Sequence, residues 1–322
     1  MSHELQFDAV SGRANMMYSG ETPWHGFGQN VEGDARYSIA ACIEASNLDN
    51  PVGLKPIYLY DKAGFLVEKP ERYTYCMKTG IEYGLVGPRY TPVQNRAAFE
   101  WFQPWLDSKL VSIHTAGALF GGAKVWIQAK IENLVMEINA KDLVEAYVML
   151  SNSHDGSTSL RIGFTPQRIV CQNTLYAAMT NKLTQLIRLR HNKNVKTNMD
   201  NVRDVMDLTR QEFVATQEQY QKLYTKGINP ADLRKYVKKL FDVEDVADKD
   251  IKTRTKNNMD EVFERFEKEL PIAGATWWNA YNAFNYQLNH TVGRNAQNRL
   301  DSLWFGVNGN KDKAAFELAL AS

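Results

Sequence analysis

The chain has few cysteines and no long apolar run, and each absence excludes a class of protein. Its three cysteines, Cys42, Cys76 and Cys171, are far apart and form no CxxC pair. This odd and scattered set argues against a disulfide framework and fits a reducing cytoplasm. No apolar run approaches the roughly 20 residues that span a bilayer, and the N-terminal segment MSHELQFDAV is too polar for a signal peptide. We therefore expect a soluble cytoplasmic protein with no membrane partner.

Familiar catalytic signatures are also missing. The sequence contains no GxxxxGK[ST], no GxGxxG after a strand, no HExxH and no GxSxG. The six histidines are scattered, and none forms a metal-like pair with Cys, Asp or Glu at helical spacing. We therefore expect a non-enzymatic protein with no cofactor and no bound metal.

Acidic residues are absent from one long window, residues 156–199. The window carries seven cations in a chain whose formal net charge is +1, and residues 1–155 carry a net charge of −5. Like charges repel unless an anion neutralises them, and nucleic-acid phosphates are the common polyanion. The same cations would also suit a solvated basic face, a helix C-terminus, or contact with the acidic part of a neighbouring subunit. As nucleic-acid-binding candidates we take Arg161, Arg168, Lys182, Arg188, Arg190, Lys193 and Lys196.

The patterns predict an α+β fold, with an antiparallel sheet region and a packed helix followed by a mostly helical C-terminal half. The chain has 322 residues, of which 44% are hydrophobic and 11% aromatic, enough to bury a large core. We expect three regions: an N-terminal arm and short helix over residues 1–50, an α+β core domain over 51–180, and a helical region over 181–322.

Alternating apolar residues predict the strands of this sheet region, from about residue 52 to 172. Gly121-Gly122 and His154–Ser157 are predicted to form hairpin turns. In the segment VWIQAKI, every second residue is apolar, which places Val125, Ile127, Ala129 and Ile131 on one face of a strand. Pro104 predicts a break in the helix that begins near Arg96. Asp34 is a candidate cap for a helix over 35–48.

Helical spacing dominates the second half. It predicts a helix over residues 174–191 with its basic residues at the C-terminal end, then helices over 200–226 and from Pro230, and an acidic helix that ends at Pro271. Thr276 is a candidate cap for the last aromatic helix, whose residues at i, i+4, i+7 and i+11 share one face. We expect this aromatic stripe to be buried in the core; the alternative is a surface on which nucleic-acid bases stack. The stripe residues are Trp277, Tyr281, Phe284 and Leu288.

Two loops hold further candidates. Trp24 and His25 lie in the glycine-rich segment SGETPWHGFGQN, where large side chains need a reason to be ordered. His154 and Asp155 are adjacent in a predicted turn. We expect a structural role, in which the Asp155 carboxylate accepts hydrogen bonds from backbone amides of the turn. The alternative is that His154 acts as a metal ligand or a general base. Stacking faces for nucleic-acid bases would come from Trp24, Phe164, Tyr176 or Trp278.

Several segments together resemble a known family. PWHGFG at 23–28, YGLVGPRYTPVQNRAAFEW at 83–101, GALFGGAKVW at 117–126 and SHDGSTSLRIGFTPQRIVCQNTL at 153–175 are similar to the phage/plasmid-like protein family, collinearly from about residue 17 to 300. Phe27 departs from the leucine expected in that pattern. The resemblance implies a bacteriophage, prophage or plasmid protein acting inside a bacterial host cell, and implies no reaction. At the level of element order, the chain is similar to single-strand annealing proteins of phage recombination, which oligomerise and hold single-stranded DNA in a basic groove.

These observations favour one function and leave two alternatives open. We expect a phage or plasmid protein that binds or anneals single-stranded DNA in recombination or replication and forms a homo-oligomer. The alternatives are a host-interaction protein that blunts a defence system, and a metal-dependent nuclease or hydrolase that uses His25, His154 and Asp155.

Overall fold

A computed structural model describes residues 12–20, 28–168, 173–174, 187–195, 197 and 205–322. It has mixed sheets and helices, with the helices concentrated in the C-terminal half, so the predicted α+β class is confirmed. The chain divides into two compact units. The first contains residues 1–133, 147–164 and 181–209, and the second contains residues 134–146, 165–180 and 210–322.

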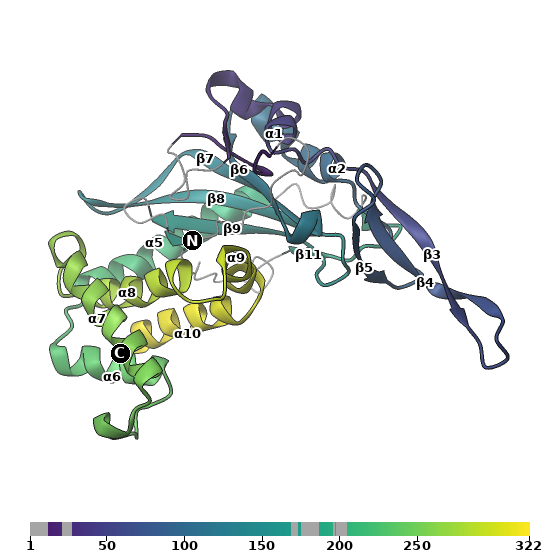
Figure 1. Cartoon of the computed structure of the whole chain (residues 1–322). Coiled ribbons are helices and arrows are strands. Elements are labelled where there is room, and N and C mark those ends of the chain that lie inside the picture. The colour runs from purple at the N-terminus through teal and green to yellow at the C-terminus, as the bar shows by residue number, and fades with distance from the viewer. Residues whose placement is uncertain (1–11, 21–27, 169–172, 175–186, 196, 198–204) are drawn as a thin grey trace. The chain divides into compact units, whose positions relative to one another are not determined.

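Most strands of the chain pair in an eight-stranded sheet (Figure 1). Its order is β10-β9-β8-β7-β6-β1-β2, and β11 also pairs with β9. The long central strands follow one another along the chain, and the short strands join the two ends of the sheet. Their bounds are β1 Met16–Tyr18, β2 Gln29–Asn30, β6 Val111–Leu119, β7 Lys124–Asn139, β8 Asp142–Ser153, β9 Leu160–Arg168, β10 Asn173–Thr174 and β11 Ile187–Leu189.

Both predicted hairpin turns are present in this sheet. Gly121 and Gly122 join β6 to β7 with φ of 74° and 91°, a conformation that favours glycine. Residues 154–159 join β8 to β9, as the Asp-Gly signal predicts. Val125, Ile127, Ala129 and Ile131 are buried as expected, but Trp126 and Gln128 on the other face are buried too.

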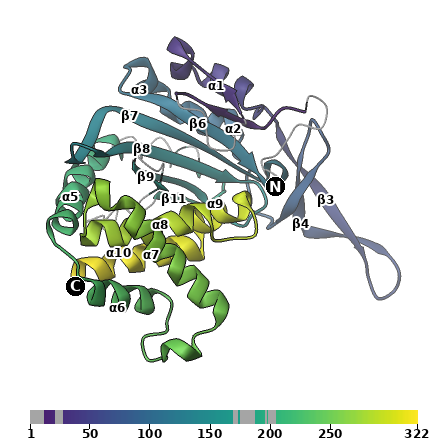
Figure 2. The ribbon, with the colours of Figure 1, turned by 60° about the vertical axis from the view of Figure 1, so that its left-hand side comes forward.

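Short helices cover part of the sheet in the first unit (Figure 2). The 3₁₀ helix η1 spans Gly33–Tyr37 and α1 spans Ile39–Ala45. Ser38, rather than Asp34, caps α1, since its hydroxyl accepts a hydrogen bond from the Ala41 N–H. The predicted break at Pro104 divides the next helical segment into α2 Asn95–Phe99, η2 Glu100–Phe102 and α3 Gln103–Asp107.

A second, three-stranded sheet also belongs to the first unit. Its order is β3-β4-β5, with β3 at Val52–Tyr60, β4 at Leu66–Cys76 and β5 at Glu82–Val86. Strand β5 pairs only with Arg72–Tyr75 of β4, so the far end of the β3–β4 hairpin is two-stranded. Figures 1 and 2 show that this end extends away from β5 as a thin arm.

The second unit is mainly helical. Pro230 lies in the first turn of α6 and Thr276 caps α8, both as predicted, and the Asn229 side chain caps α6. The aromatic stripe Trp277, Tyr281, Phe284 and Leu288 is core, since all four side chains are buried. The helices are α5 Val205–Thr225, α6 Pro230–Leu240, η4 Asp248–Asp250, α7 Thr253–Ala273, α8 Trp277–His290, α9 Ala296–Phe305 and α10 Val307–Ala321.

The helix predicted over residues 174–191 is wrong at both ends. Thr174 pairs with Gln167 in the sheet, and residues 187–189 form β11 against β9. Leu189 is buried in this pairing, so contacts with a distant strand override a local helical pattern. Residues 175–186 lie outside the part of the chain that the structure describes.

Candidate functional site

Apart from Arg168, four of the predicted cations lie on β9, on β11 and on the segment that follows β11. Arg161 of β9 and Arg188 of β11 are direct cross-strand partners in the antiparallel pair, which puts both side chains on one face of the sheet. Arg188, Arg190 and Lys193 are exposed, and among the described residues none of the three makes an ion pair. We call Arg161, Arg188, Arg190 and Lys193 the basic strip.

Neighbouring residues hold the basic strip in place. The His191 ring is buried and stacks on Tyr90 with 4.9 Å between ring centroids. The Thr91 N–H donates to the His191 carbonyl at 3.1 Å, and Val195 is buried. These contacts fix the backbone of residues 190–195 while the side chains of Arg190 and Lys193 are exposed to solvent.

One further cation was missed by the sequence reasoning. Arg89 directly precedes Tyr90, is exposed, and makes no ion pair with a described residue. It stands on the segment that contacts His191, so the fold brings it to the region of the basic strip. No charge signal could have found it, because it lies 67 residues before the acid-free window begins.

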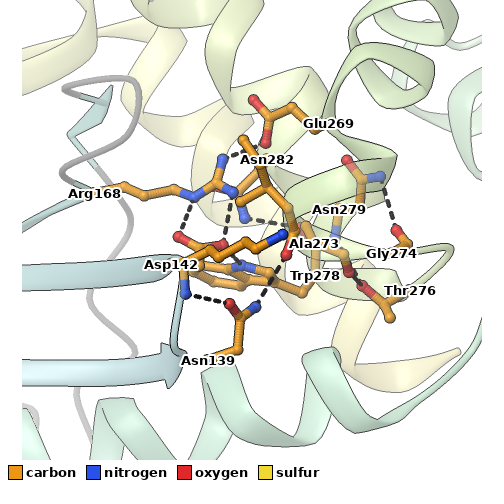
Figure 3. A network of polar contacts seen from close by, with 12 residues as sticks. Asn139, Asp142, Arg168, Glu269, Ala273, Gly274, Thr276, Trp278, Asn279 and Asn282 are labelled. Carbon is orange, nitrogen blue, oxygen red and sulfur yellow. Dashed lines mark hydrogen bonds and ion pairs between the residues drawn. The ribbon is translucent and has the colours of Figure 1, made fainter.

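The structure corrects the prediction for Arg168, whose side chain is fully buried. Its guanidinium binds Asp142 through two hydrogen bonds of 2.7 and 2.6 Å and also binds Glu269 (Figure 3). Arg265 adds a second cation to Glu269 at 2.7 Å. Arg168 is therefore enclosed by carboxylates from β8 and α7 and is not available to a phosphate.

The same network removes one of the candidate stacking faces. The Trp278 indole N–H donates to Asp142 Oδ2 at 2.8 Å, and its side chain is 0% exposed. Phe164 is also buried. Around this centre, the amides of Asn139, Asn279 and Asn282 donate to backbone carbonyls of Ile272, Gly274 and Trp278 (Figure 3). The network ties α7 and α8 to the sheet strands of the second unit and offers no surface to a base.

His154 is buried inside the first unit and not presented to a substrate. Its Nε2 lies 2.8 Å from Asn95 Oδ1, its ring stacks on Tyr83, and it is 0% exposed. Burial lowers the pKa of His154 to about 3, and burial lowers the pKa of His191 to about 4. Both rings are therefore neutral at pH 7, and neither contributes charge to the basic strip.

Asp155 has the structural role that the sequence favours. Its Oδ1 accepts a hydrogen bond from the Ser153 hydroxyl at 2.5 Å and one from the Ser157 N–H at 2.8 Å, so the carboxylate closes its own turn. Trp24, His25, Tyr176, Lys182 and Lys196, the remaining candidates, lie outside the described residues.

Further buried titratable groups belong to the packing of the second unit. Burial raises the pKa of the Asp312 carboxyl to about 7, although hydrogen bonds from Asn285 and Tyr281 lower it. The Asn285 amide donates to Asp312 Oδ1 at 2.8 Å between α8 and α10. Across the described ranges, no group of three or more His, Cys, Asp or Glu side chains could hold a metal ion.

No curated protein and no solved structure matches this chain. Within the described part of the chain, every helix is too short or too polar to cross a bilayer. One family model does match, over residues 82–304, and its description is "domain of unknown function (DUF932)". Because this match covers more than half of the sequence, the chain belongs to the DUF932 family.

Proposed function

We propose that this protein binds single-stranded nucleic acid through the basic strip, Arg161, Arg188, Arg190 and Lys193, with Arg89 beside it. The observation that carries the proposal is the exposure of Arg188, Arg190 and Lys193 without ion pairs to described residues, on a segment whose backbone is fixed by buried neighbours. Cations of this kind are stabilised by phosphates, which supply negative charge at regular intervals along an extended strand.

The cross-strand pair of Arg161 and Arg188 supports the same function. The pair places two cations side by side on one face of the sheet. Planar guanidinium groups suit phosphate oxygens. The arrangement therefore favours a polyanionic ligand over a neutral one.

The biological setting of the proposal comes from the resemblance to phage and plasmid proteins. In a mobile element, a single-strand binder acts in recombination or replication, by protecting or annealing exposed strands inside the bacterial cytoplasm. The nuclease alternative gains no support from His154, which is buried and bonded to Asn95. The host-interaction alternative predicts a protein partner and no affinity for nucleic acid.

Charge reversal in the basic strip tests the proposal. We expect Arg188→Glu/Arg190→Glu to weaken binding of a fluorescently labelled oligonucleotide at least ~10-fold, because phosphate contacts contribute most of the sequence-independent affinity. Fluorescence anisotropy measures this, with single-stranded DNA, RNA of the same sequence and duplex DNA as separate ligands.

The matched control carries the same change of charge elsewhere. Lys235 and Lys239 are exposed on α6, so Lys235→Glu/Lys239→Glu changes the net charge equally and should leave affinity within about twofold. Equal losses of affinity in both variants would show that binding depends on net charge and not on the basic strip. If the wild-type protein did not bind the oligonucleotide, the proposal would be wrong.

A further inference from the structure

The buried face of α10 changes in chemistry along the helix, which packs against α8 (Figure 2). The buried side chains lie at helical spacing, and the first two are polar while the rest are apolar. They are Asn308, Asp312, Ala315, Phe316 and Ala319. A buried carboxyl has to be neutralised by a cation or by a proton, since an unpaired charge in a core costs several kcal/mol. The packing of the first half of α10 therefore depends on how Asp312 is neutralised.

The contacts of Asp312 come from neutral donors on α8. The Asn285 amide donates to Asp312 Oδ1 at 2.8 Å, and the Tyr281 hydroxyl is a second donor. Asp312 is 4% exposed and makes no ion pair with a described residue. Its neighbours in the sequence, Lys311 and Lys313, are less buried, and Lys313 pairs with Glu317 on the same helix. Protonation is thus the means of neutralising Asp312 that these contacts leave.

The titratable groups of the neighbouring helices supply no countercharge to Asp312 within the described part of the chain. From α6, the Tyr236 hydroxyl donates to the Ala315 carbonyl at 3.0 Å. Burial raises the pKa of Tyr236 well above its usual value, and the charge of Asp312 raises it further, so this phenol stays neutral. The charged groups of α9, Arg299 and Asp301, are not among the groups that shift the pKa of Asp312.

These surroundings favour the protonated form of the carboxyl while α10 is packed. Burial raises the pKa of Asp312 to about 7, although the hydrogen bonds from Asn285 and Tyr281 lower it. A carboxyl exposed to water has a pKa of about 3.9. The folded-state pKa is the higher one, so the stabilisation is complete below about pH 4 and is lost as the pH rises to about 7.

We propose that Asp312 is a protonation switch for α10: the neutral carboxyl keeps the first half of the helix packed on α8, and ionisation lets that half open to solvent. The carboxylate is fully hydrated only when α10 moves away from α8, whereas the neutral carboxyl stays in the core without that penalty. The second half of the helix buries Phe316 and Ala319, which carry no charge at any pH. The switch does not use the basic strip, so it can be right or wrong independently of the proposed function.

Hydrogen exchange of the backbone amides of residues 311–315 measures this opening. After correction for the intrinsic exchange rate, the opening constant should rise about tenfold between pH 6 and pH 8, because the pKa of Asp312 falls from about 7 to about 3.9 on opening. Asp312→Asn keeps the shape of the side chain and cannot ionise, so its opening constant should be the same at both pH values. Asp260→Asn, at an exposed carboxyl on α7, is the matched control and should keep the tenfold rise.

A second variant tests the switch while the carboxyl is retained. Asn285→Ala removes a hydrogen bond that favours the carboxylate, so the pKa of Asp312 rises further and the opening constant should rise more than tenfold over the same pH range. A smaller rise in this variant, or a rise that persists in Asp312→Asn, would overturn the proposal. So would an equal rise in the amides of α7 of the wild type, because pH would then act on unfolding of the whole unit and not on α10.

Discussion

At the scale of single residues, the surroundings of an arginine determine whether its charge is available to a ligand. Arg168 and Arg188 both belong to the acid-free window, but Arg168 is enclosed by two carboxylates and Arg188 is exposed without an ion pair to a described residue. The partners of Arg168 lie 26 and 101 residues away in the sequence. No local pattern could have announced them, and the same limit holds for any buried ion pair that joins distant elements.

Removal of Arg168 should therefore destabilise the fold. Arg168→Met leaves Asp142 and Glu269 buried without their common partner, and such a change costs about 3–5 kcal/mol of the free energy of unfolding. Arg265→Met, at a partly exposed side chain, should cost only about 1 kcal/mol. Urea unfolding followed by tryptophan fluorescence compares the two. A stable Arg168→Met variant with weakened nucleic-acid binding would return Arg168 to the binding site.

The two buried histidines make stability depend on pH. Both have a folded-state pKa below the unfolded value of about 6.5, so the unfolded chain takes up protons first and stability is lost as pH falls below about 6.5. Asp312 has the opposite effect: its folded-state pKa of about 7 exceeds the unfolded value, so its contribution is lost as pH rises toward 7. The net profile of the wild type is therefore the sum of opposing slopes.

A substitution at His191 isolates one of these slopes. Phe has a planar ring of similar size and can keep the stack on Tyr90. Relative to the wild type, His191→Phe should gain about 2 kcal/mol in the free energy of unfolding between pH 7 and pH 5. Urea unfolding at both pH values measures the gain. The same difference from wild type at both pH values would contradict a neutral, buried His191.

At the scale of elements, local signals predicted the strands and turns well and one helix badly. The Gly121-Gly122 turn and the Asp155-Gly156 turn could be predicted because a turn residue with positive φ is usually glycine. The segment around Leu189 carries apolar residues at helical spacing, but β9 takes it up as a strand. The exposure of Leu59 and Tyr60 on β3 could not be predicted from the sequence either, since alternating Tyr and Leu is equally typical of a core strand.

Gly117 gives an element-scale test of packing inside the central sheet. It pairs with Trp126 across β6 and β7, and a Cβ at this position would meet the Trp126 ring at 2.3 Å. Gly117→Ala should cost about 1–3 kcal/mol, because the buried ring cannot move without disturbing its neighbours. Gly87→Ala, where a Cβ meets nothing within 4 Å, should be near neutral. Thermal unfolding of both variants decides; equal melting temperatures would contradict this packing.

At the scale of the whole molecule, only some of the cations that are close together in the sequence belong to one region of the folded protein. The acid-free window predicted that cations gather, and Arg161, Arg188, Arg190 and Lys193 do belong to two paired strands and the segment that follows. The window could not show that Arg168 is used for packing, nor that Arg89 lies on a segment that joins the same region. Local composition therefore indicates which kind of residue forms the candidate site, and tertiary pairing determines which residues belong to it.

The salt dependence of single-stranded DNA affinity tests the central claim most directly. Each phosphate contact contributes about 0.7 to the slope of log affinity against log salt for a single strand, so Arg188→Gln/Arg190→Gln should flatten the slope by about 1.4. Lys235→Gln/Lys239→Gln on α6 should leave it unchanged. Parallel slopes for the wild type and the Arg188/Arg190 variant would contradict the assignment of the basic strip as the phosphate-binding surface.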